Sequence, residues 1–258
     1  MTHQTILYSQ TDGVGLLTLN RPEVMNALNR RMRAELTAAI TAAPATGARV
    51  LVLTGAGRAF CSGQDLTDTQ GGPIDLEKVL NEEYVPLLRA IADSPLPVVA
   101  AVNGAAAGAG ANLALGCDVV IAAESASFIQ AFTRIGLVPD AGGTWLLPRQ
   151  VGLARAMGAM LFAEKIPAMQ AAEWGMIWEA VPDADFAARW QARAATLAGG
   201  PTLAYGQLKA ALRAGLENGY ADQLSVEARA QAACGASADF REGVAAFLQK
   251  RPARFTGT

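Results

Sequence analysis

Short apolar segments with strand spacing or helical spacing alternate along the first half of the chain. Residues 6–10 and 14–19 flank Thr11-Asp12-Gly13, and an Asp-Gly pair between two apolar segments is a strong hairpin signal. Asn29 stands where a helix N-cap is favoured, ahead of residues 32–40, in which Met, Leu and Ile recur every four positions. The pattern therefore predicts a hairpin followed by an amphipathic helix.

The order of strand, glycine-rich turn and helix then repeats. Aliphatic residues predict buried strands at 50–53, 97–102 and 119–122, and apolar periodicity predicts helices at 79–92 and 109–115. This alternation of strands with helices favours an α/β fold over an all-helical one.

Beyond Leu153 the sequence is alanine-rich and predicts mostly helix, with a break at Gly199-Gly200-Pro201. We expect an α/β core at 1–198 and a helical segment at 199–258. Because alanine-rich helices of low amphipathicity often pack against other subunits, the helical segment is predicted to mediate oligomerisation.

Composition argues against several classes of function. The chain has 258 residues, of which 52% are apolar, and this length suits one core of moderate size. No apolar stretch reaches the ~18–20 residues needed to span a bilayer. The N-terminus lacks the pattern of a signal peptide, so we expect a cytoplasmic protein with no membrane partner. With 21 basic and 23 acidic residues, the chain has no excess of positive charge that would attract nucleic acid.

Histidine and cysteine are too sparse for several catalytic and metal-binding arrangements. His3 is the single histidine, which excludes a Ser-His-Asp triad and a multi-histidine metal site. The three cysteines are scattered and form no CxxC motif, so neither a disulfide framework nor a zinc site is supported. Arg30, Arg31 and Arg33 form a short basic cluster, which predicts either a solvated helix face or a phosphate contact.

Asp140 stands out because a glycine-rich turn at 141–143 exposes it directly after an apolar segment. Two other glycine-bearing segments, 60–66 and 103–112, lie upstream, and each is expected to follow a strand and open a helix. The first N–H groups of a helix are unpaired, and two that converge on one oxygen form an oxyanion hole. Together the segments predict two donors that polarise a carbonyl and one carboxylate that moves a proton, which is chemistry on a thioester.

Simpler interpretations of these segments stay open. The glycines could only permit tight turns, and residues 104–110 could form a dinucleotide loop, although the GxGxxG spacing and a later acidic partner are missing. Asp65 is expected to be stabilised by a helix N-terminus, and Asp118 is expected to be a hydrogen-bonded turn residue. Both carboxylates are therefore interpreted as structural.

The motifs resemble those of the crotonase superfamily, also called the enoyl-CoA hydratase/isomerase family, over essentially the whole chain. The segments that carry the resemblance are 19–22, 26–28, 59–66, 103–110, 117–118 and 136–144. The resemblance implies a spiral of ββα units with a helical C-terminal segment that builds trimers, often paired into hexamers. It also implies an acyl-coenzyme A substrate and a reaction that needs no cofactor.

The resemblance assigns roles to residues by position. It implies that the backbone N–H groups of Gln64 and Ala109 form the oxyanion hole. It also implies a set of residues that bind the coenzyme or the acyl group, with the last of them at a coenzyme A phosphate: Ala27, Ser62, Gly63, Asn112, Phe132, Trp145 and Lys250.

Two departures from the hydratases of the family bear on the reaction. Those enzymes use one glutamate in the helix after the glycine turn and a second ahead of the later turn, because addition of water needs two groups that handle protons. Here the two positions hold Asn112 and Phe132, and neither side chain acts as a base at neutral pH. Asp140 occupies the position of the aspartate found in isomerases. The resemblance therefore implies an isomerase and not a hydratase.

Further segments, 131–140, 143–149, 173–178 and 237–243, resemble the branch of the family that acts in phenylacetate degradation. This resemblance implies that the substrate is ring-1,2-epoxyphenylacetyl-CoA and that the product is the ring-expanded oxepin-CoA. In that reaction Asp140 would shuttle the proton next to the thioester.

Apolar side chains near Asp140 in sequence are expected to shape the site. An aromatic acyl pocket would suit Phe132, Trp145 and Trp178, although such residues more often pack in a core. Burial is also expected to raise the pKa of Asp140, through Ile135, Leu137, Val138 and Trp145.

Alternative functions stay open on the same residues. A Δ3,Δ2-enoyl-CoA isomerase of fatty acyl-CoA needs the same single base as the epoxide isomerase. Dehalogenation of an aryl-CoA typically pairs the aspartate with a histidine, and only His3 exists. A scaffold that binds acyl-CoA or partner proteins without turnover is the alternative of another class. Other enzymes of the same pathway are further candidate partners.

Overall fold

The chain begins with the predicted β-hairpin. The computed structural model describes residues 3–68 and 75–258. Strand β1 (Ile6–Thr11) pairs antiparallel with β2 (Val14–Leu19) across a two-residue turn. Asp12 and Gly13 have φ angles of 50° and 78°, which is the left-handed pair that this turn requires. The hairpin prediction is confirmed.

The larger sheet has the strand order β1-β2-β3-β5-β7-β10, and its strands from β2 onward are parallel. The added strands are β3 (Val50–Gly55), β5 (Val98–Val102), β7 (Val119–Ala123) and β10 (Glu179–Val181). Every residue of β5 is buried, because helices cover both faces of the sheet at this point. The three strands predicted from aliphatic runs are therefore confirmed.

A smaller sheet has the order β4-β6-β8-β9. Its strands are β4 (Ala59–Cys61), β6 (Ala105–Ala107), β8 (Ser127–Ile129) and β9 (Ile166–Pro167). The chain passes from β3 to β4, from β5 to β6 and from β7 to β8, so each turn adds one strand to each sheet. This is the spiral of ββα units that the resemblance implied. The short strands of this sheet escaped prediction because two or three residues show no periodicity.

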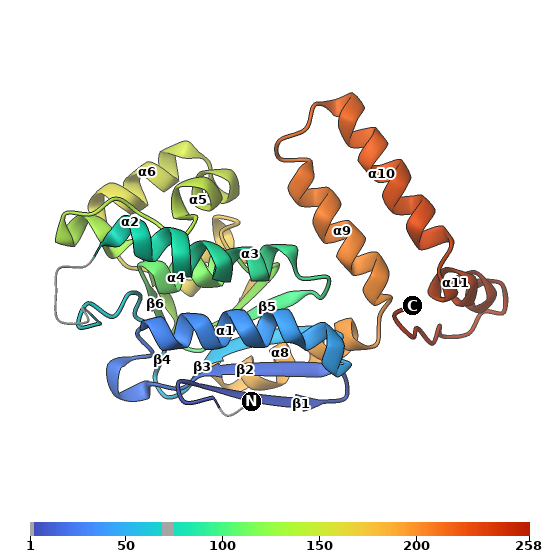
Figure 1. Cartoon of the computed structure of the whole chain (residues 1–258), viewed down its shortest axis with the longest axis horizontal. Coiled ribbons are helices and arrows are strands. Elements are labelled where there is room, and N and C mark those ends of the chain that lie inside the picture. The colour runs from blue at the N-terminus through green and yellow to red at the C-terminus, as the bar shows by residue number, and fades with distance from the viewer. Residues whose placement is uncertain (1–2, 69–74) are drawn as a thin grey trace.

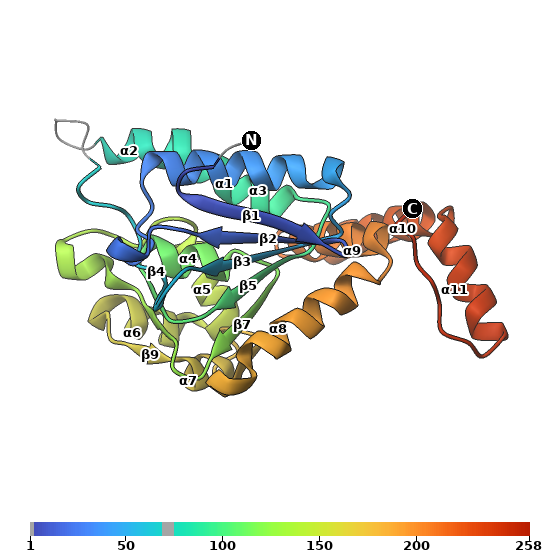
Figure 2. The ribbon, with the colours of Figure 1, turned by 90° about the horizontal axis from the view of Figure 1, so that it is seen from below.

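Helices cover the larger sheet on both sides, as Figure 2 shows. Helix α1 (Arg30–Ala42) packs against α3 (Val85–Asp93) on one face, and α8 (Asp183–Ala198) packs on the other. The side chain of Asn29 accepts a hydrogen bond of 2.9 Å from the N–H of Met32, which confirms the predicted N-cap.

The helix predicted at 79–92 is longer and less regular than expected. It runs as α2 (Leu76–Val79), a π-helical turn named η3 (Leu80–Tyr84), and α3. The remaining elements of the core are η1 (Pro22–Val24), η2 (Ala43–Thr46), α4 (Ala109–Leu115), η4 (Ala131–Ile135), α5 (Gly143–Val151), α6 (Leu153–Phe162) and α7 (Ala168–Glu173).

After α8 the chain forms a C-terminal arm that stands beside the core (Figure 1). The arm consists of α9 (Thr202–Ala214), α10 (Tyr220–Gly235) and α11 (Ala238–Leu248). It follows the predicted break, but its status as a separate unit stays a prediction. In the described ranges, with residues 1–2 and 69–74 left aside, no helix is both long and apolar enough to cross a membrane.

A buried ion pair joins the arm to the core. The ammonium group of Lys209 in α9 lies 2.7 Å from Asp118 Oδ2 and donates to the carbonyl of Ile91 at 2.7 Å. Arg213 reaches the other oxygen of Asp118 at 3.0 Å. Asp118 also accepts a bond of 2.8 Å from the N–H of Val98, so its predicted structural role is confirmed.

Removal of this tether should destabilise the fold. We expect Lys209→Met to lower the free energy of unfolding by about 3 kcal/mol, because the buried carboxylate of Asp118 loses its closest cation. Chemical denaturation measures the loss. The exposed Lys165→Met is the matched control and should unfold like wild type, and equal midpoints for the two variants would contradict the role given to Lys209.

Candidate active site

Two chain segments approach each other at the carboxyl ends of β4 and β6. Gly63 has a φ of 98°, and a Cβ there would lie 2.8 Å from the carbonyl oxygen of Ala107 and 3.4 Å from the nitrogen of Ala109. Only glycine combines this left-handed backbone with such a close approach. The sequence therefore brings the Gly63-Gln64 loop against the first turn of α4.

The two predicted donors are unpaired at this junction. Leu28 and Gln64 form an isolated β-bridge. The N–H of Leu28 donates to the carbonyl of Gly63 at 2.8 Å, and the carbonyl of Leu28 accepts from the N–H of Asp65 at 3.1 Å. The N–H of Gln64 therefore points away from the bridge. Ala109 is the first residue of α4, where an N–H has no helical acceptor. Within residues 3–68 and 75–258, neither N–H donates a hydrogen bond.

One part of the prediction is wrong. Gln64 lies in an extended segment and opens no helix, so Asp65 does not lie at a helix N-terminus. Asp65 instead pairs with Arg21 at 2.8 Å and accepts from Thr67. Burial acts to raise the pKa of Asp65, but these hydrogen bonds and the Arg21 charge outweigh it, so the pKa is lowered. Asp65 is structural, for a reason other than the one expected.

Asp140 is held against the helix that carries Ala109. The side-chain amide of Asn112, one turn into α4, donates to the backbone carbonyl of Asp140 at 2.7 Å. Gln130 in turn donates to the oxygen of Asn112 at 2.8 Å. A side chain on Gly143 would overlap Asn112, so the glycine lets the turn after Asp140 close onto the amide. These contacts fix the backbone at Asp140.

The carboxylate of Asp140 has the properties of a base. Burial raises its pKa from the ordinary 3.8 to about 6. Its Oδ1 atom is buried and, in the part of the chain that the structure describes, has no hydrogen-bond partner. The cause of this burial differs in part from the prediction, since Ile135 is 56% exposed and Val138 is 73% exposed.

The other predicted residues divide into those near this junction and those away from it. Phe132 is buried, and its ring lies 3.8 Å from the place where a Cβ of Gly108 would stand. Asn112 has no exposed surface, so it lies behind Asp140 rather than at an open pocket wall. Trp145 is half-buried, and the guanidinium of Arg149 covers its ring at 4.2 Å.

Ala27 and Ser62 lie in loops next to the Gly63 segment. The carbonyl of Ala27 accepts from Arg21 at 2.7 Å, and the N–H of Ser62 donates to Met25 at 3.0 Å. Trp178, directly before β10, is 66% exposed, so in this single chain it does not close an aromatic pocket. Lys250 follows α11, and Figure 1 shows that helix far from α4 and α5.

The prediction for Arg33 is wrong, and Tyr84 was missed. Arg33 neither faces solvent nor is free for a phosphate, because it is 2% exposed and pairs with Glu83 at 2.6 Å. Tyr84 is buried and donates to the side chain of Gln64 at 2.6 Å. The sequence signal for the burial of Arg33 is its place beside the apolar stripe of α1, three residues before Leu36.

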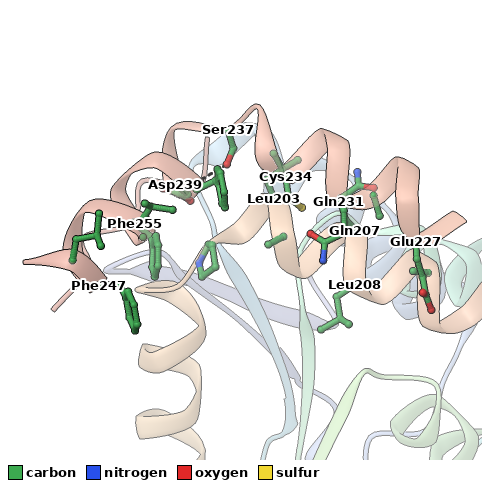
Figure 3. A pocket seen from close by; sticks show the side chains of 18 residues that line it. Leu203, Gln207, Leu208, Glu227, Gln231, Cys234, Ser237, Asp239, Phe247 and Phe255 are labelled. Atoms are coloured by element: carbon green, nitrogen blue, oxygen red, sulfur yellow. Dashed lines mark hydrogen bonds between the residues drawn. The ribbon is translucent and has the colours of Figure 1, made fainter. Parts of the chain in front are cut away.

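A cavity of about 690 Å³ lies away from this junction, between α9, α10 and α11 (Figure 3). Its walls are mostly apolar, with Leu208 and Phe247 among them. The carboxylate of Asp239 accepts from the N–H groups of Thr256 and Gly257 at 2.6 and 2.8 Å. The cavity therefore offers a mostly apolar surface, and its Asp239 carboxylate is engaged by backbone N–H groups.

Comparison with known proteins identifies the class. The profile of the family described as "Enoyl-CoA hydratase/isomerase" matches residues 9–258. A protein of Rhodobacter capsulatus named "Probable enoyl-CoA hydratase" is 65% identical over 257 residues, which cover 100% of each chain. The 1,2-epoxyphenylacetyl-CoA isomerase of Escherichia coli K12 is 49% identical over 257 residues, with 98% of each chain covered.

Solved structures agree with this assignment. A crystal structure of a putative enoyl-CoA hydratase/isomerase from Mycobacterium abscessus superposes with a TM-score of 0.92 at 40% identity, and covers 98% of this chain and 100% of that one. The chain therefore belongs to the enoyl-CoA hydratase/isomerase family, and it is an enzyme of the crotonase superfamily, which acts on acyl-CoA substrates.

Charging Asp140 should cost folding free energy. Since the folded state binds this proton more tightly than the unfolded chain, stability present below pH ~4 is lost as the pH rises through about 6. After a discount for partial exposure, Asp140→Asn should be more stable than wild type by about 1–2 kcal/mol at pH 8 and equal to it at pH ~3.5. Denaturant titration at both pH values measures the difference.

Asp183→Asn is the control with the opposite sign. Hydrogen bonds from Ser125 lower the pKa of Asp183, so loss of its charge should not stabilise the fold at pH 8. A gain for both variants, or for neither, would contradict the assignment of a raised pKa to Asp140 alone.

Proposed function

We propose that this enzyme is an acyl-CoA isomerase in which Asp140 moves a proton and the N–H groups of Gln64 and Ala109 stabilise a thioester enolate. The observation that carries the proposal is a half-buried carboxylate whose buried Oδ1 has no partner among the described residues, held on the helix that provides one of two N–H donors likewise unpaired there. The neighbouring carboxylates Asp65 and Glu83 are paired with arginines and are poor bases.

The proposed reaction moves one proton between two carbon atoms. The Asp140 carboxylate removes a proton from the carbon next to the thioester, and the electron pair of that C–H bond passes to the carbonyl oxygen. The N–H groups of Gln64 and Ala109 would donate to the resulting enolate oxygen. Protonated Asp140 then returns the proton two carbons further on, and the double bond moves next to the thioester. No electron leaves the substrate, so no cofactor is required.

Hydration is disfavoured by the two side chains that replace the hydratase glutamates. Asn112 donates its amide to Asp140 and accepts from Gln130, so both of its polar atoms are engaged within the protein. Phe132 cannot accept a proton. A single base supports proton transfer, whereas addition of water needs a second group to activate the water. The name of the R. capsulatus relative describes that protein and does not change this chemistry.

Ring-1,2-epoxyphenylacetyl-CoA is the substrate that we propose first, as part of phenylacetate degradation. The 49% identity to the E. coli isomerase supports this choice, and so does Phe132, an aromatic side chain beside Gly108. A Δ3-enoyl-CoA is the second candidate. In its ring-expanded form the epoxide is also a β,γ-unsaturated thioester, so both substrates require the same transfer of a proton from the α to the γ carbon.

Activity measurements on wild type and Asp140→Asn test the proposal. Wild type should convert enzymatically generated epoxyphenylacetyl-CoA or a straight-chain 3-enoyl-CoA, and Asp140→Asn should lose about 10²–10⁴-fold in kcat/KM. Because the base must be ionised, kcat/KM of wild type should fall tenfold per pH unit below about 6 and level off above it.

Asp183→Asn should retain wild-type activity, since that carboxylate only binds the loop at Ser125. Full activity of Asp140→Asn, or no turnover of either substrate by wild type, would refute the isomerase and favour a non-catalytic acyl-CoA-binding scaffold. Formation of a 3-hydroxyacyl product from a 2-enoyl-CoA would favour a hydratase.

We further propose that the C-terminal arm binds other copies of this chain, as trimers or hexamers. Large apolar side chains of the arm, from its helices and from the connection between α9 and α10, face solvent in the single chain: Leu208, Leu212, Leu216, Tyr220, Phe240 and Phe247. A patch of this kind marks a contact surface. Lys250 follows α11, which Figure 1 shows far from α4 and α5. Its predicted contact with a coenzyme A phosphate would therefore involve the site of another copy.

Charge on this surface should break the assembly. Leu212→Glu combined with Phe247→Glu should shift wild-type trimers or hexamers towards monomers in sedimentation velocity. Leu7→Glu is the matched control, because Leu7 is also about half exposed but lies on β1 outside the arm. A monomeric wild type, or an unchanged double variant, would refute the role of the arm.

A further inference from the structure

The side chain of Gln64 is anchored by two buried groups. Its oxygen accepts from the hydroxyl of Tyr84 at 2.6 Å and from Arg33 Nη1 at 2.8 Å. Its amide nitrogen donates to the backbone carbonyl of Asp65 at 3.3 Å. Both ends of this side chain are therefore fixed by the protein.

Arg33 ties the two partners of the Leu28–Gln64 bridge together. The same Nη1 atom that binds Gln64 also donates to the carbonyl of Leu28 at 2.5 Å. Glu83 neutralises the guanidinium by accepting from Nε and Nη2 at 2.9 and 2.6 Å. The guanidinium lies 4.9 Å from the centre of the Tyr84 ring, so the two anchoring groups also support each other.

The π-helical turn η3 supplies two parts of this anchor, Glu83 and Tyr84. Turns of this type recur at functional sites, because the extra residue redirects the side chains around it. Burial raises the pKa of the Tyr84 hydroxyl above its ordinary value, and the charge of Asp140 adds to that rise. The anchor therefore contacts Gln64 directly and lies within electrostatic reach of Asp140.

The two oxyanion donors differ in how their backbones are held. Ala109 belongs to α4, whose helical hydrogen bonds fix its peptide group. Gln64 belongs to no helix or sheet and is held by an isolated bridge of two hydrogen bonds. A donor stabilises an enolate only while it keeps its direction and distance, which requires support from surrounding groups.

We propose that Tyr84 and Arg33 are positioning residues, which hold the N–H of Gln64 in the oxyanion hole through their hydrogen bonds to its side chain. This inference rests on the proposed function. It assigns a role in the reaction to the side chain of Gln64, although only the backbone N–H of this residue is expected to touch the substrate. It also gives the buried Arg33–Glu83 pair a purpose beyond the packing of α1 against η3.

The test uses acetoacetyl-CoA, whose enolate absorbs in the near ultraviolet when an oxyanion hole stabilises it. Wild type should develop this band on binding. Tyr84→Phe keeps the ring and removes one hydrogen bond to Gln64. Gln64→Ala removes the hydrogen-bonded side chain but keeps the backbone N–H of residue 64. Each should weaken the band and lower kcat by about 5–30-fold, less than the loss for a whole donor, with KM nearly unchanged. The double variant should be no worse than the more impaired single variant.

Tyr8→Phe is the matched control, because Tyr8 also donates to a glutamine side chain, Gln10, at 2.8 Å, but on the hairpin. It should retain the wild-type band and kcat. A band of wild-type strength in Tyr84→Phe and Gln64→Ala would overturn the inference and leave the isomerase intact, even if both variants unfold at lower temperature. Absence of the band in wild type would instead remove the oxyanion hole, and the inference with it.

Discussion

The close approach of the Gly63 loop to the first turn of α4 is the constraint on which the rest of the site depends. Among the residues that the structure describes, two peptide N–H groups stay unpaired there, although each could find an acceptor in an ordinary turn or strand. The smaller sheet makes this possible, since parallel pairing of β4 and β6 places their carboxyl ends side by side. The larger sheet supplies most of the buried strand core, and the smaller one sets the geometry of the site.

The carboxylates of this structure differ in whether they pair with a cation, and this difference singles out Asp140. Asp65, Glu83 and Asp118 each lie against a cation and serve the fold. Asp140 is half-buried without such a partner in the part of the chain that the structure describes, and its backbone rather than its carboxylate receives the hydrogen bond from Asn112. The protein thus fixes the position of Asp140 while it leaves the charged group available, which is the combination that proton transfer requires.

The sequence was sufficient for the elements and motifs that follow local rules. The Asp12-Gly13 turn, the Asn29 cap and the aliphatic strands depend on neighbours in the chain, and all were predicted. The motif order also pointed to the superfamily, although residues near Asp140 such as Val138 proved more exposed than expected. The short strands of the smaller sheet and the contacts of Arg33 and Tyr84 depend on segments about 20 to 50 residues apart, so no local pattern reveals them.

The packing of Gly143 against Asn112 limits which side chains position 112 can hold. The space around the amide is so tight that even a methyl group on residue 143 would overlap it. A glutamate at position 112 would add a methylene and a charge in this space, next to the carbonyl of Asp140 that the amide now binds. A single exchange at this position is therefore expected to move the turn that carries Asp140. Residues 112 and 143 are constrained together, because each limits the space that the other can occupy.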